Sequence, residues 1–526
     1  MMDAVSLQVM SNALRAVAEE MEAALIRAAY SPNITERHDC STAIFDADGR
    51  MVVQSASIPV HLGAMPEAVA AVRDRGCGPG EIWAINDPYR GGTHLPDITL
   101  ISPIALGGRI GAYAVSRAHH ADVGGMAAGS MPAGSRELLQ EGLVIPPVRI
   151  VRDDRPVRDV IALVLANTRT PVEREGDLRA QIAAHRLADR RLREVAERHT
   201  HARVREAFAA LLDYAERRTR GAIAAMPDGT WHAAEALEGD GVTTDPVWIR
   251  LAVTIAGDRL TVDFTGTDPA AAGNINCPLA VTRSAVYFVV RAVTDPDIPA
   301  SAGAFAAVHV IAPLGCLVNA TSPSAVVAGN VETSSRIVDA VFTALGQAID
   351  VPAQGQGTMN NLVIGGVGFT YYETVGGGQG ASADADGPSG VHVAMSNTLN
   401  TPIEALETAY PLRVVRYRLR RGTGGAGARR GGDGIERAIE VLADVDVSVL
   451  AERRASAPRG RSGGGDGAAG RTTQNGDPLP AKWRGRLHAG DIIAIESPGG
   501  GGYGPPPDDP ESSRELSSTP TSVQIE

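Results

Sequence analysis

Apolar residues near the start of the chain recur with the period of a helix. Between residues 6 and 30 they fall three or four positions apart, the spacing that places side chains on one face of an α-helix. The residues on this face are Leu7, Met10, Leu14, Val17, Met21 and Leu25. Pro32 lacks a backbone N–H and restricts Ser31, so the pattern predicts an amphipathic helix that ends there.

The apolar segments that follow alternate with the period of β-strands. Two of them, at 41–45 and 50–54, flank Asp48-Gly49, and an Asp-Gly pair suits the positive-φ turn of a tight hairpin. Between residues 81 and 125, short strand-like segments alternate with polar, glycine-rich loops. These segments are 98–101 and 110–115. The pattern predicts a hairpin followed by further strands.

The middle of the chain changes from a helical to a strand-like pattern. Residues 158–225 are rich in Arg and Glu with one apolar side, which predicts helices whose charged side faces solvent and forms intrahelical ion pairs. After a turn at 227–230 come strand-like segments at 248–255 and 260–264 and a helix-like one at 282–292. Strands and long helices without regular βαβ units predict a multi-lobed α+β fold with mixed sheets.

Changes in composition suggest how the chain is divided. Glycine is dense at 355–391 and denser at 421–470, which fits either flexible linkers or turns that let the backbone approach a ligand or a neighbouring strand. The last residues are rich in Pro, Ser and acidic side chains and predict a disordered tail. The expected parts are an N-terminal lobe at 1–225 with the candidate site, a central α+β lobe at 226–420, a glycine-rich β lobe at 421–504 and the tail at 505–526.

The composition is that of a globular chain with an acidic balance. Hydrophobic residues make up 44% of the 526 residues, and 49 Lys and Arg against 61 Asp and Glu give a net charge of −12. An acidic chain is a poor candidate for binding nucleic acid or anionic lipid. No segment reaches the ~18 consecutive apolar residues of a membrane span. We therefore expect neither nucleic acid nor membrane among the partners.

The cysteines and the single lysine limit the cellular compartments and the types of nucleotide site that we expect. The four cysteines lie far apart, and the N-terminal residues do not form a basic and apolar export signal, so we expect a cytoplasmic protein with reduced thiols. Lys482 is the only lysine and lies far from any GxxxxGK[ST] segment, which excludes a Walker-type phosphate loop. If the reaction uses ATP, another chain is expected to bind it.

Histidine and aspartate are concentrated between the strand-like segments. The segment 86–97 contains His94 and Asp97, and His119 follows the strand-like segment at 110–115. Imidazole nitrogen and carboxylate oxygen together suit a borderline divalent ion such as Zn²⁺, Mn²⁺ or Fe²⁺. Because Asp97 precedes one strand and His119 follows another, loops at strand ends can converge on one ion that polarises a carbonyl or ionises water.

Other readings of the polar residues stay open at this point. The histidines can equally be hydrogen-bonded loop residues, with the aspartates capping turns. Cys40 follows Asp39 and is a candidate nucleophile, although an isolated cysteine is more often inert core. The segment at 116–119 lacks a GxSxG elbow, and no helix follows the glycines at 497–504, so neither a hydrolase triad nor a dinucleotide site is expected.

Several ordered segments together resemble the hydantoinase B/oxoprolinase family, which includes the B components of ATP-dependent hydantoinases and related components of the acetone carboxylase type. They span nearly the whole chain, too many ordered matches to arise by chance. These segments are 36–41, 61–65, 86–97, 118–125, 175–181, 263–267, 357–361, 410–413 and 497–504.

The resemblance implies a division of labour between two polypeptides. An ATP-binding partner of the hydantoinase A type phosphorylates the carbonyl oxygen of a cyclic amide such as a hydantoin, 5-oxoproline or a related lactam or imide. The B component holds a divalent metal ion, and metal-bound water completes the hydrolysis. The resemblance therefore implies a hetero-oligomeric hydrolase that is active only with its A-type partner.

The resemblance also implies roles for individual residues. Those that it assigns to the metal are Asp39, His94, Asp97 and His119. His120 and Asp122 are expected to act as catalytic proton-transfer groups or as supports of the ligands. His61 and Arg90 are expected to orient substrate or phosphate, because arginine binds oxyanions through a forked pair of donors.

Two alternatives differ from the hydrolase. One keeps the metal but carboxylates a ketone, as acetone or acetophenone carboxylases do, since both reactions place an activated carbonyl next to a metal. The other is a scaffold that only docks the A-type partner, in which case the histidines are structural. Bicarbonate dependence of ATP turnover separates the first from a hydrolase, and bound metal separates the second.

Overall fold

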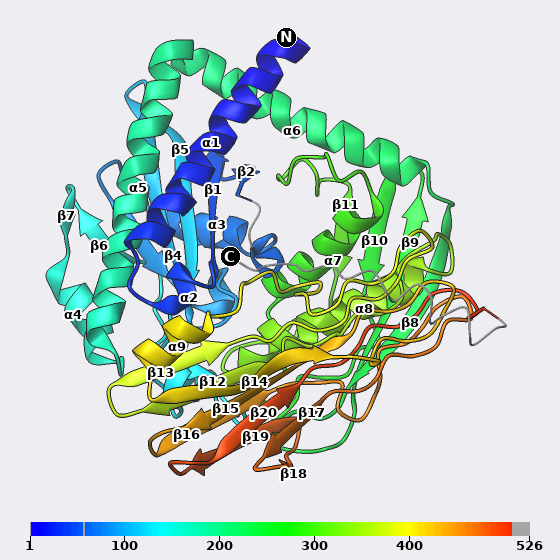
Figure 1. Ribbon diagram of the computed structural model, residues 1–526. Helices are drawn as coiled ribbons and strands as arrows, with labels where there is room; N and C mark the ends of the chain where they lie inside the picture. The colour runs from blue at the N-terminus through cyan, green and yellow to red at the C-terminus, as the bar shows by residue number, and fades with distance from the viewer. Residues whose placement is uncertain (1, 56–57, 508–526) are drawn as a thin grey trace.

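The computed structural model describes residues 2–55 and 58–507, and helices pack there against four β-sheets (Figure 1). The predicted α+β fold with mixed sheets and long helices is confirmed. The predicted tail at 505–526 lies, from residue 508 onward, outside the described residues.

An antiparallel sheet forms the N-terminal part, with strand order β2-β1-β5-β4-β3-β6-β7. Its strands are β1 (Cys40–Asp46), β2 (Met51–Gln54), β3 (Ile82–Ile85), β4 (Asp97–Leu106), β5 (Arg109–His119), β6 (Val148–Arg152) and β7 (Arg155–Pro156). The predicted hairpin is β1–β2, and its turn contains Gly49 at a φ of +81°. The two strand-like segments that follow lie in β4 and β5, which confirms both predictions.

Helices cover both faces of this sheet. α1 (Ala4–Ala28) packs against α5 (Pro171–His199) and β1, and α5 also contacts β4 and β5 (Figure 1). α3 (Met65–Arg73) covers the opposite face. The remaining helices of this part are α2 (Pro32–Thr35), α4 (Arg158–Ala166) and α6 (His201–Ala224).

The predicted N-terminal helix and the predicted charged helices are confirmed. α1 buries the apolar face that the period-3.6 pattern marks, from Met10 to Leu25, and Pro32 begins α2 instead of continuing α1. On α5 and α6, arginines pair with acidic residues four positions away, as in Arg193–Asp189. These helices are stabilised by burial of their apolar faces and by ion pairs on their solvent-exposed faces.

A second sheet, with order β11-β10-β9-β8, carries α7 (Leu279–Val293) and α8 (Ser334–Leu345), and the largest apolar cluster lies between them. Only its β10–β11 pair is parallel within the described strands. A π-helical segment, Gly329–Thr333, leads into α8. The strands are β8 (Gly229–Leu237), β9 (Val247–Ala256), β10 (Arg259–Asp263) and β11 (Val308–Ile311).

Two further sheets pack face to face over one apolar cluster and form a β-sandwich. One has the order β13-β12-β16-β19 and the other β14-β15-β20-β17-β18, with α9 (Ile403–Ala409) at its edge. The strands are β12 (Asn361–Gly366), β13 (Phe369–Glu373), β14 (Leu412–Arg420), β15 (Gly434–Val441), β16 (Val445–Leu450), β17 (Arg471–Gln474), β18 (Asp477–Pro478), β19 (Lys482–Leu487) and β20 (Ile492–Glu496).

The glycine-rich segments are closely packed backbone and not free linkers. The N–H of Gly500 donates to the carbonyl of Gly432 at 2.9 Å, and that of Gly432 donates to Gln379 at 2.9 Å. A Cβ atom on Gly432 would lie 1.9 Å from the carbonyl oxygen of Pro388. Of the two alternatives that the sequence left open, the close approach of backbone to neighbouring backbone is the correct one.

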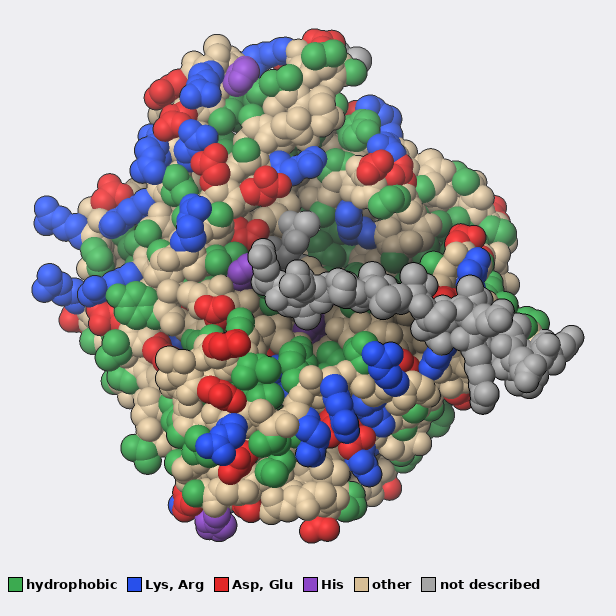
Figure 2. Space-filling model, in the orientation of Figure 1, with side chains coloured by type: hydrophobic (Ala, Val, Ile, Leu, Met, Phe, Trp, Pro, Cys, Tyr) green, Lys and Arg blue, Asp and Glu red, His purple; other side chains and the backbone are tan. Residues whose placement is uncertain are grey.

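The structure bears on the predictions about disulfides, membrane spans and surface charge. The four cysteines are free thiols, and among the described helices none has the length and apolarity needed to cross a bilayer. Acidic and basic side chains are interspersed over the face shown in Figure 2. The lobe boundaries near 225 and 420 and the cytoplasmic location stay predictions. Strands β12 and β16, which lie on either side of residue 420 in the sequence, pair within one sheet.

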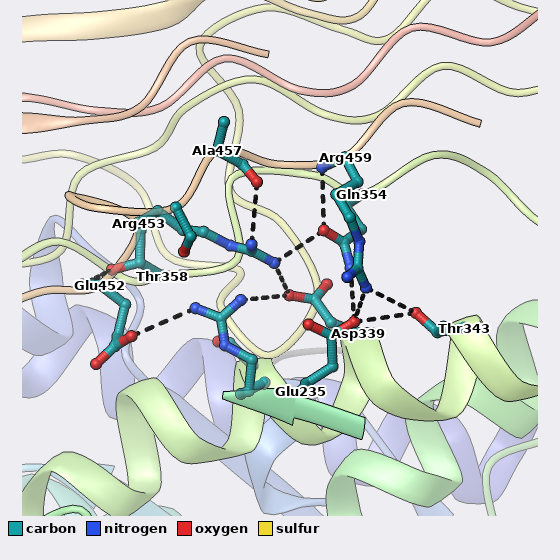
Figure 3. A network of polar contacts seen from close by, with 12 residues as sticks. Glu235, Asp339, Thr343, Gln354, Thr358, Glu452, Arg453, Ala457 and Arg459 are labelled. Carbon is teal, nitrogen blue, oxygen red and sulfur yellow. Dashed lines mark hydrogen bonds and ion pairs between the residues drawn. The ribbon is translucent and has the colours of Figure 1, made fainter. Parts of the chain in front are cut away.

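Buried charges join β8, α8 and the segment that follows β16 (Figure 3). Asp339 accepts from Arg453 at 2.6 Å and from Arg336 at 3.2 Å, and Arg336 also lies 3.4 Å from Glu452. Glu452 in turn pairs with Lys482, the single lysine, which is buried. Each charge is compensated by a partner from another part of the chain, so the network fixes how these parts meet.

Neutralising one member of this network should cost far more than neutralising a surface pair. In Asp339→Asn, Arg336 and Arg453 lose a shared buried carboxylate, and we expect a loss of about 3–5 kcal/mol in the free energy of unfolding. The control is Asp213→Asn, which breaks an exposed pair with Arg217 on α6 and should change stability by less than about 1 kcal/mol. Urea unfolding of both variants measures the difference, and equal losses would contradict this account.

His185 on α5 is a buried histidine that holds α5 to the sheet. Its Nδ1 lies 2.7 Å from the hydroxyl of Ser102 on β4, and its Nε2 lies 2.9 Å from that of Ser116 on β5. Burial lowers the pKa of His185 to about 3, so the imidazole is neutral in the folded protein.

This pKa makes the folded state sensitive to acid. Between the unfolded pKa of about 6.5 and the folded value, the unfolded chain binds a proton that the folded chain does not, so stability falls as the pH falls. From pH 7 to pH 5 the free energy of unfolding should drop by about 2 kcal/mol more in the wild type than in His185→Gln. Urea unfolding at both pH values tests this, and parallel pH dependences would refute it.

Candidate metal centre

Three strand ends meet at one end of the N-terminal sheet. Asp97 is the first residue of β4, and antiparallel pairing places it directly opposite His119, the last residue of β5. β1 begins opposite Ala118, so Asp39 precedes β1 beside His119, whose N–H donates to the Asp39 carbonyl at 3.0 Å. Register alone therefore brings residues from three segments to the same place.

A short loop adds His94 to this sheet end. The N–H of Asp97 donates to the carbonyl of His94 at 3.1 Å, which closes a turn and brings the two side chains together. Gly91, at a φ of +95°, lets this loop lie against α3, where a Cβ atom would come within 2.2 Å of the Ala68 nitrogen. The buried Arg117 on β5 donates to the Gly91 carbonyl at 2.7 Å, which fixes the loop to the sheet.

His94, Asp97 and His119 form a compact, buried group. One ligand atom from each lies within 4.8 Å of the others. His94 Nε2 is 3.3 Å from Asp97 Oδ1, and the two imidazole rings are 5.1 Å apart, centre to centre. Two nitrogens and a carboxylate oxygen at these separations match the donor set of a first-row divalent ion.

Buried ring nitrogens in this group have no hydrogen-bond partner. These are Nε2 of His119 and both ring nitrogens of His94, of which Nε2 contacts Asp97 Oδ1 at 3.3 Å without the geometry of a hydrogen bond. Leaving such an atom unsatisfied costs about 1–3 kcal/mol, so the arrangement needs an explanation. A cation held between Asp97 and the two Nε2 atoms supplies one, and the donor set fits it.

The protonation states are also those of metal ligands. Burial alone would raise the pKa of the Asp97 carboxyl, but the imidazoles of His94 and His61 hold it well below its usual range. Burial and the neighbouring His94 lower the pKa of His119 well below its usual value. An ionised Asp97 carboxylate and a neutral His119 imidazole are the forms of these side chains that coordinate a metal.

Residues around the group orient it. The Asn33 amide nitrogen lies 3.2 Å from His119 Nδ1, to which it donates. The flipped amide would instead place its oxygen there, accept the Nδ1 proton and leave the Nε2 lone pair for a ligand. The hydroxyl of Thr93 donates to Asp97 Oδ2. His61 lies with Nε2 3.5 Å from the same oxygen, and its Nδ1 is 2.8 Å from the Ser41 hydroxyl.

The group faces a small cavity of about 20 Å³, which has room for an ion or a water molecule but not for a ring. Asp39 lines the same cavity, outside the group of three. Burial raises the pKa of the Asp39 carboxyl, although Arg37, at 3.8 Å, opposes the shift. The other lining residues are Ile58, Val60, His61, Asn330, Val331, Met359, Tyr372, Thr374, Met395, Ser396 and Thr398.

Three predicted site residues lie elsewhere within the described part of the chain. His120 is buried, with Nε2 2.9 Å from the Gln181 amide oxygen on α5. Asp122 accepts from the backbone of Gly124 and Gly129 and pairs with Arg169 at 2.9 Å. These contacts tie His120 to α5 and Asp122 to the loop after β5, and neither residue lines the small cavity beside the group of three.

Arg90 likewise does not reach the cavity lining. It pairs with Asp87 at 3.4 Å, and its side chain is half exposed. Its contacts give it no access to the buried group, so the predicted role in orienting substrate has no geometric support here. His61, by contrast, lines the cavity next to Asp97.

Sequence reasoning missed Tyr372, which packs on the site from β13. Its ring stacks on His119 at 4.4 Å with an angle of 7°, and the Arg37 guanidinium lies 4.8 Å from its centre. The Tyr372 hydroxyl donates to Asn361 at 2.9 Å. A tyrosine far along the chain carries no local signal of this contact, because only tertiary packing brings the two regions together.

Known proteins resemble this chain over nearly its whole length. The model of the hydantoinase B/oxoprolinase family matches residues 3–506, so the chain belongs to that family, as its sequence segments indicate. An uncharacterized protein of Methanocaldococcus jannaschii is 39% identical, with 96% of this chain and 91% of the relative covered. A Pseudomonas sp. protein named as the B component of a "Putative D-/L-hydantoinase" is 32% identical, with 96% and 90% covered.

Other relatives are longer or known from solved structures. 5-oxoprolinase 1 of Arabidopsis thaliana is 36% identical over 95% of this chain, which spans only 42% of that protein. The ATP-dependent caprolactamase from Pseudomonas jessenii has a TM-score of 0.90 at 28% identity, covering 98% of this chain and 93% of its own. An acetone carboxylase has a TM-score of 0.87 at 20% identity, covering 97% and 77%, and so shares the fold.

Tyr372 should be needed for tight metal binding although it offers no ligand to the group. Replacing the stacked ring in Tyr372→Leu frees the His119 imidazole, and we expect the metal affinity to fall about 10–100-fold. Tyr372→Phe keeps the stack and should stay close to the wild type. Competition with a chromophoric chelator measures both affinities. Tight binding in the leucine variant would contradict an orienting role for the stack.

Proposed function

We propose that this chain is the metal-binding component of an ATP-dependent cyclic amide hydrolase that works with an ATP-binding partner of the hydantoinase A type. The observation that carries the proposal is the buried group of His94, Asp97 and His119, with two Nε2 atoms that have no hydrogen-bond partner. Family membership and relatives named for hydantoin, oxoproline and caprolactam chemistry support the substrate class.

The residues of the chain have distinct roles in this proposal. His94, Asp97 and His119 hold a Zn, Mn or Fe ion, with Asp39 as a further ligand from the cavity wall. When bound, such an ion acts as a Lewis acid and lowers the pKa of water toward ~7. His61 faces the same space, and its hydrogen bond to Ser41 fixes the ring so that Nε2 can hold or pass a proton.

Hydrolysis of a lactam needs activation that this chain does not supply. A lactam carbonyl is a poor electrophile because the ring nitrogen donates electrons into it. Transfer of the ATP γ-phosphoryl group to the carbonyl oxygen removes that protection. Water then adds to the carbon, and the C–N bond breaks with a proton moving to nitrogen, which leaves an acyl phosphate. A second water releases phosphate from this carbon, so ATP and two waters yield ADP, phosphate and the opened amino acid.

A division of labour with a second polypeptide is supported by the single lysine. Lys482 is buried against Glu452 and lies within the structural charge network, so it is not available to a phosphate. The Pseudomonas relative is named as one component of a hydantoinase, and the Arabidopsis oxoprolinase is more than twice as long as the part that matches. Both fit a separate ATP-binding part, and a hetero-oligomer is the expected assembly.

The proposal predicts that His94→Ala removes both the metal and the ring-opening activity. Elemental analysis of the complex with the A-type partner should find a divalent metal in the wild type and only background levels in the variant. His488→Ala, which changes a largely exposed histidine, should keep both properties. Normal ring opening by a metal-free His94→Ala complex would overturn the proposal.

The same complex distinguishes the alternative reactions. ATP turnover that depends on a cyclic amide and not on bicarbonate supports the hydrolase. Turnover that requires bicarbonate and a ketone identifies a carboxylase of the acetone carboxylase type. A wild-type complex without bound metal supports a scaffold.

A further inference from the structure

A second, larger cavity adjoins the metal cavity. It has a volume of about 610 Å³, within the range of small-molecule sites, and opens on the face where α1, β2 and α7 meet. Figure 2 shows a hollow in this face of the molecule. Ile58 lines both cavities, and Asn397 of the larger one lies between Ser396 and Thr398 of the smaller one. The two cavities are therefore neighbours, with Ile58 in the wall of both.

The larger cavity, which we call the outer chamber, combines an apolar wall with two cationic groups. Its apolar side chains include Val53, Leu62 and Phe288, which suit the carbon skeleton of a compact ring. Arg15 on α1 and Arg291 on α7 supply the positive charge. The acidic residues of the lining are Glu19 and Asp297.

Arg291 is a half-buried guanidinium without a carboxylate partner. It donates to the Ile298 carbonyl at 2.8 Å, and no carboxylate oxygen of the described residues lies within 4.0 Å of it. By contrast, Arg283, two turns earlier on the same helix, pairs with Glu67. Arg15 likewise has no ion pair among the described residues. Burial lowers the pKa of Arg291, as expected for a charge that lacks compensation.

A half-buried arginine that pairs with no carboxylate in the described part of the chain, in a chamber beside the candidate metal centre, points to an anionic ligand. We infer that the outer chamber holds the body of the substrate and that Arg291, assisted by Arg15, binds a small oxyanion on it. This inference rests on the proposed function. The metal cavity is too small for a ring, so the inference places the ring in the outer chamber, on the side of Ile58 away from the metal cavity.

The oxyanion has two possible sources with the same chemistry. It is either a carboxylate substituent on the cyclic amide or the phosphoryl group that activates the carbonyl. A forked guanidinium recognises both through paired N–H donors. The probes that separate them are 5-oxoproline, which carries a carboxylate, 2-pyrrolidone, the same ring without it, and inorganic phosphate.

Binding of these probes to the purified holoprotein tests the inference by isothermal titration calorimetry. We expect an anionic probe to bind at least 10-fold tighter than 2-pyrrolidone. Arg291→Gln should weaken that anion at least 10-fold and leave 2-pyrrolidone unchanged. Arg15→Gln, an exposed change that cannot disturb the core, should weaken the anion about 2–5-fold. Arg75→Gln, also exposed, is the control and should have no effect.

The outcomes are distinct. Arginine-dependent binding of 5-oxoproline assigns the site to a substrate carboxylate, and arginine-dependent binding of phosphate alone assigns it to the phosphoryl group. Anion binding that neither Arg291→Gln nor Arg15→Gln weakens overturns the inference. Because these measurements require no turnover, they stand apart from the His94→Ala test, so the outer chamber and the metal centre can each fail independently.

Discussion

The antiparallel pairing of β4 with β5 is the constraint on which the site depends. It places Asp97 opposite His119, and the turn that closes on Asp97 adds His94. A slip of one residue would turn each side chain to the other face of the sheet, so the register cannot vary without losing the group. α1 and α5 on one face and α3 on the other bury both faces and fix that register.

Much of the fold and the centre of the site could be predicted because local patterns determine them. The apolar period of α1 and the Asp48-Gly49 turn are read within a few residues. Two strands that are neighbours in sequence are flanked by His94, Asp97 and His119. Because the connection between these strands is short, antiparallel pairing is expected.

Other features of the site could not be predicted, because they depend on contacts between segments far apart in the sequence or on local hydrogen bonds that give a side chain a structural use. Tyr372 reaches His119 only after the β-sandwich docks on the N-terminal sheet. Asp122 looks like a catalytic carboxylate in a His- and Asp-rich segment, yet it accepts from Gly124 two positions ahead, a common alternative use of such a side chain. The sequence also cannot show that Arg291 lacks the carboxylate that its neighbour Arg283 has.

The wall of the metal cavity has a consequence for how the protein matures. The candidate ligands lie within the first 119 residues, whereas Asn330, Tyr372 and Thr398 close the cavity above them. During synthesis, the ligands leave the ribosome long before the segments that seal them from solvent. The cavity that would enclose an ion is therefore complete only once the later segments have docked. In the proposed metal site, the residues that can discriminate between ions thus come together only in the finished chain.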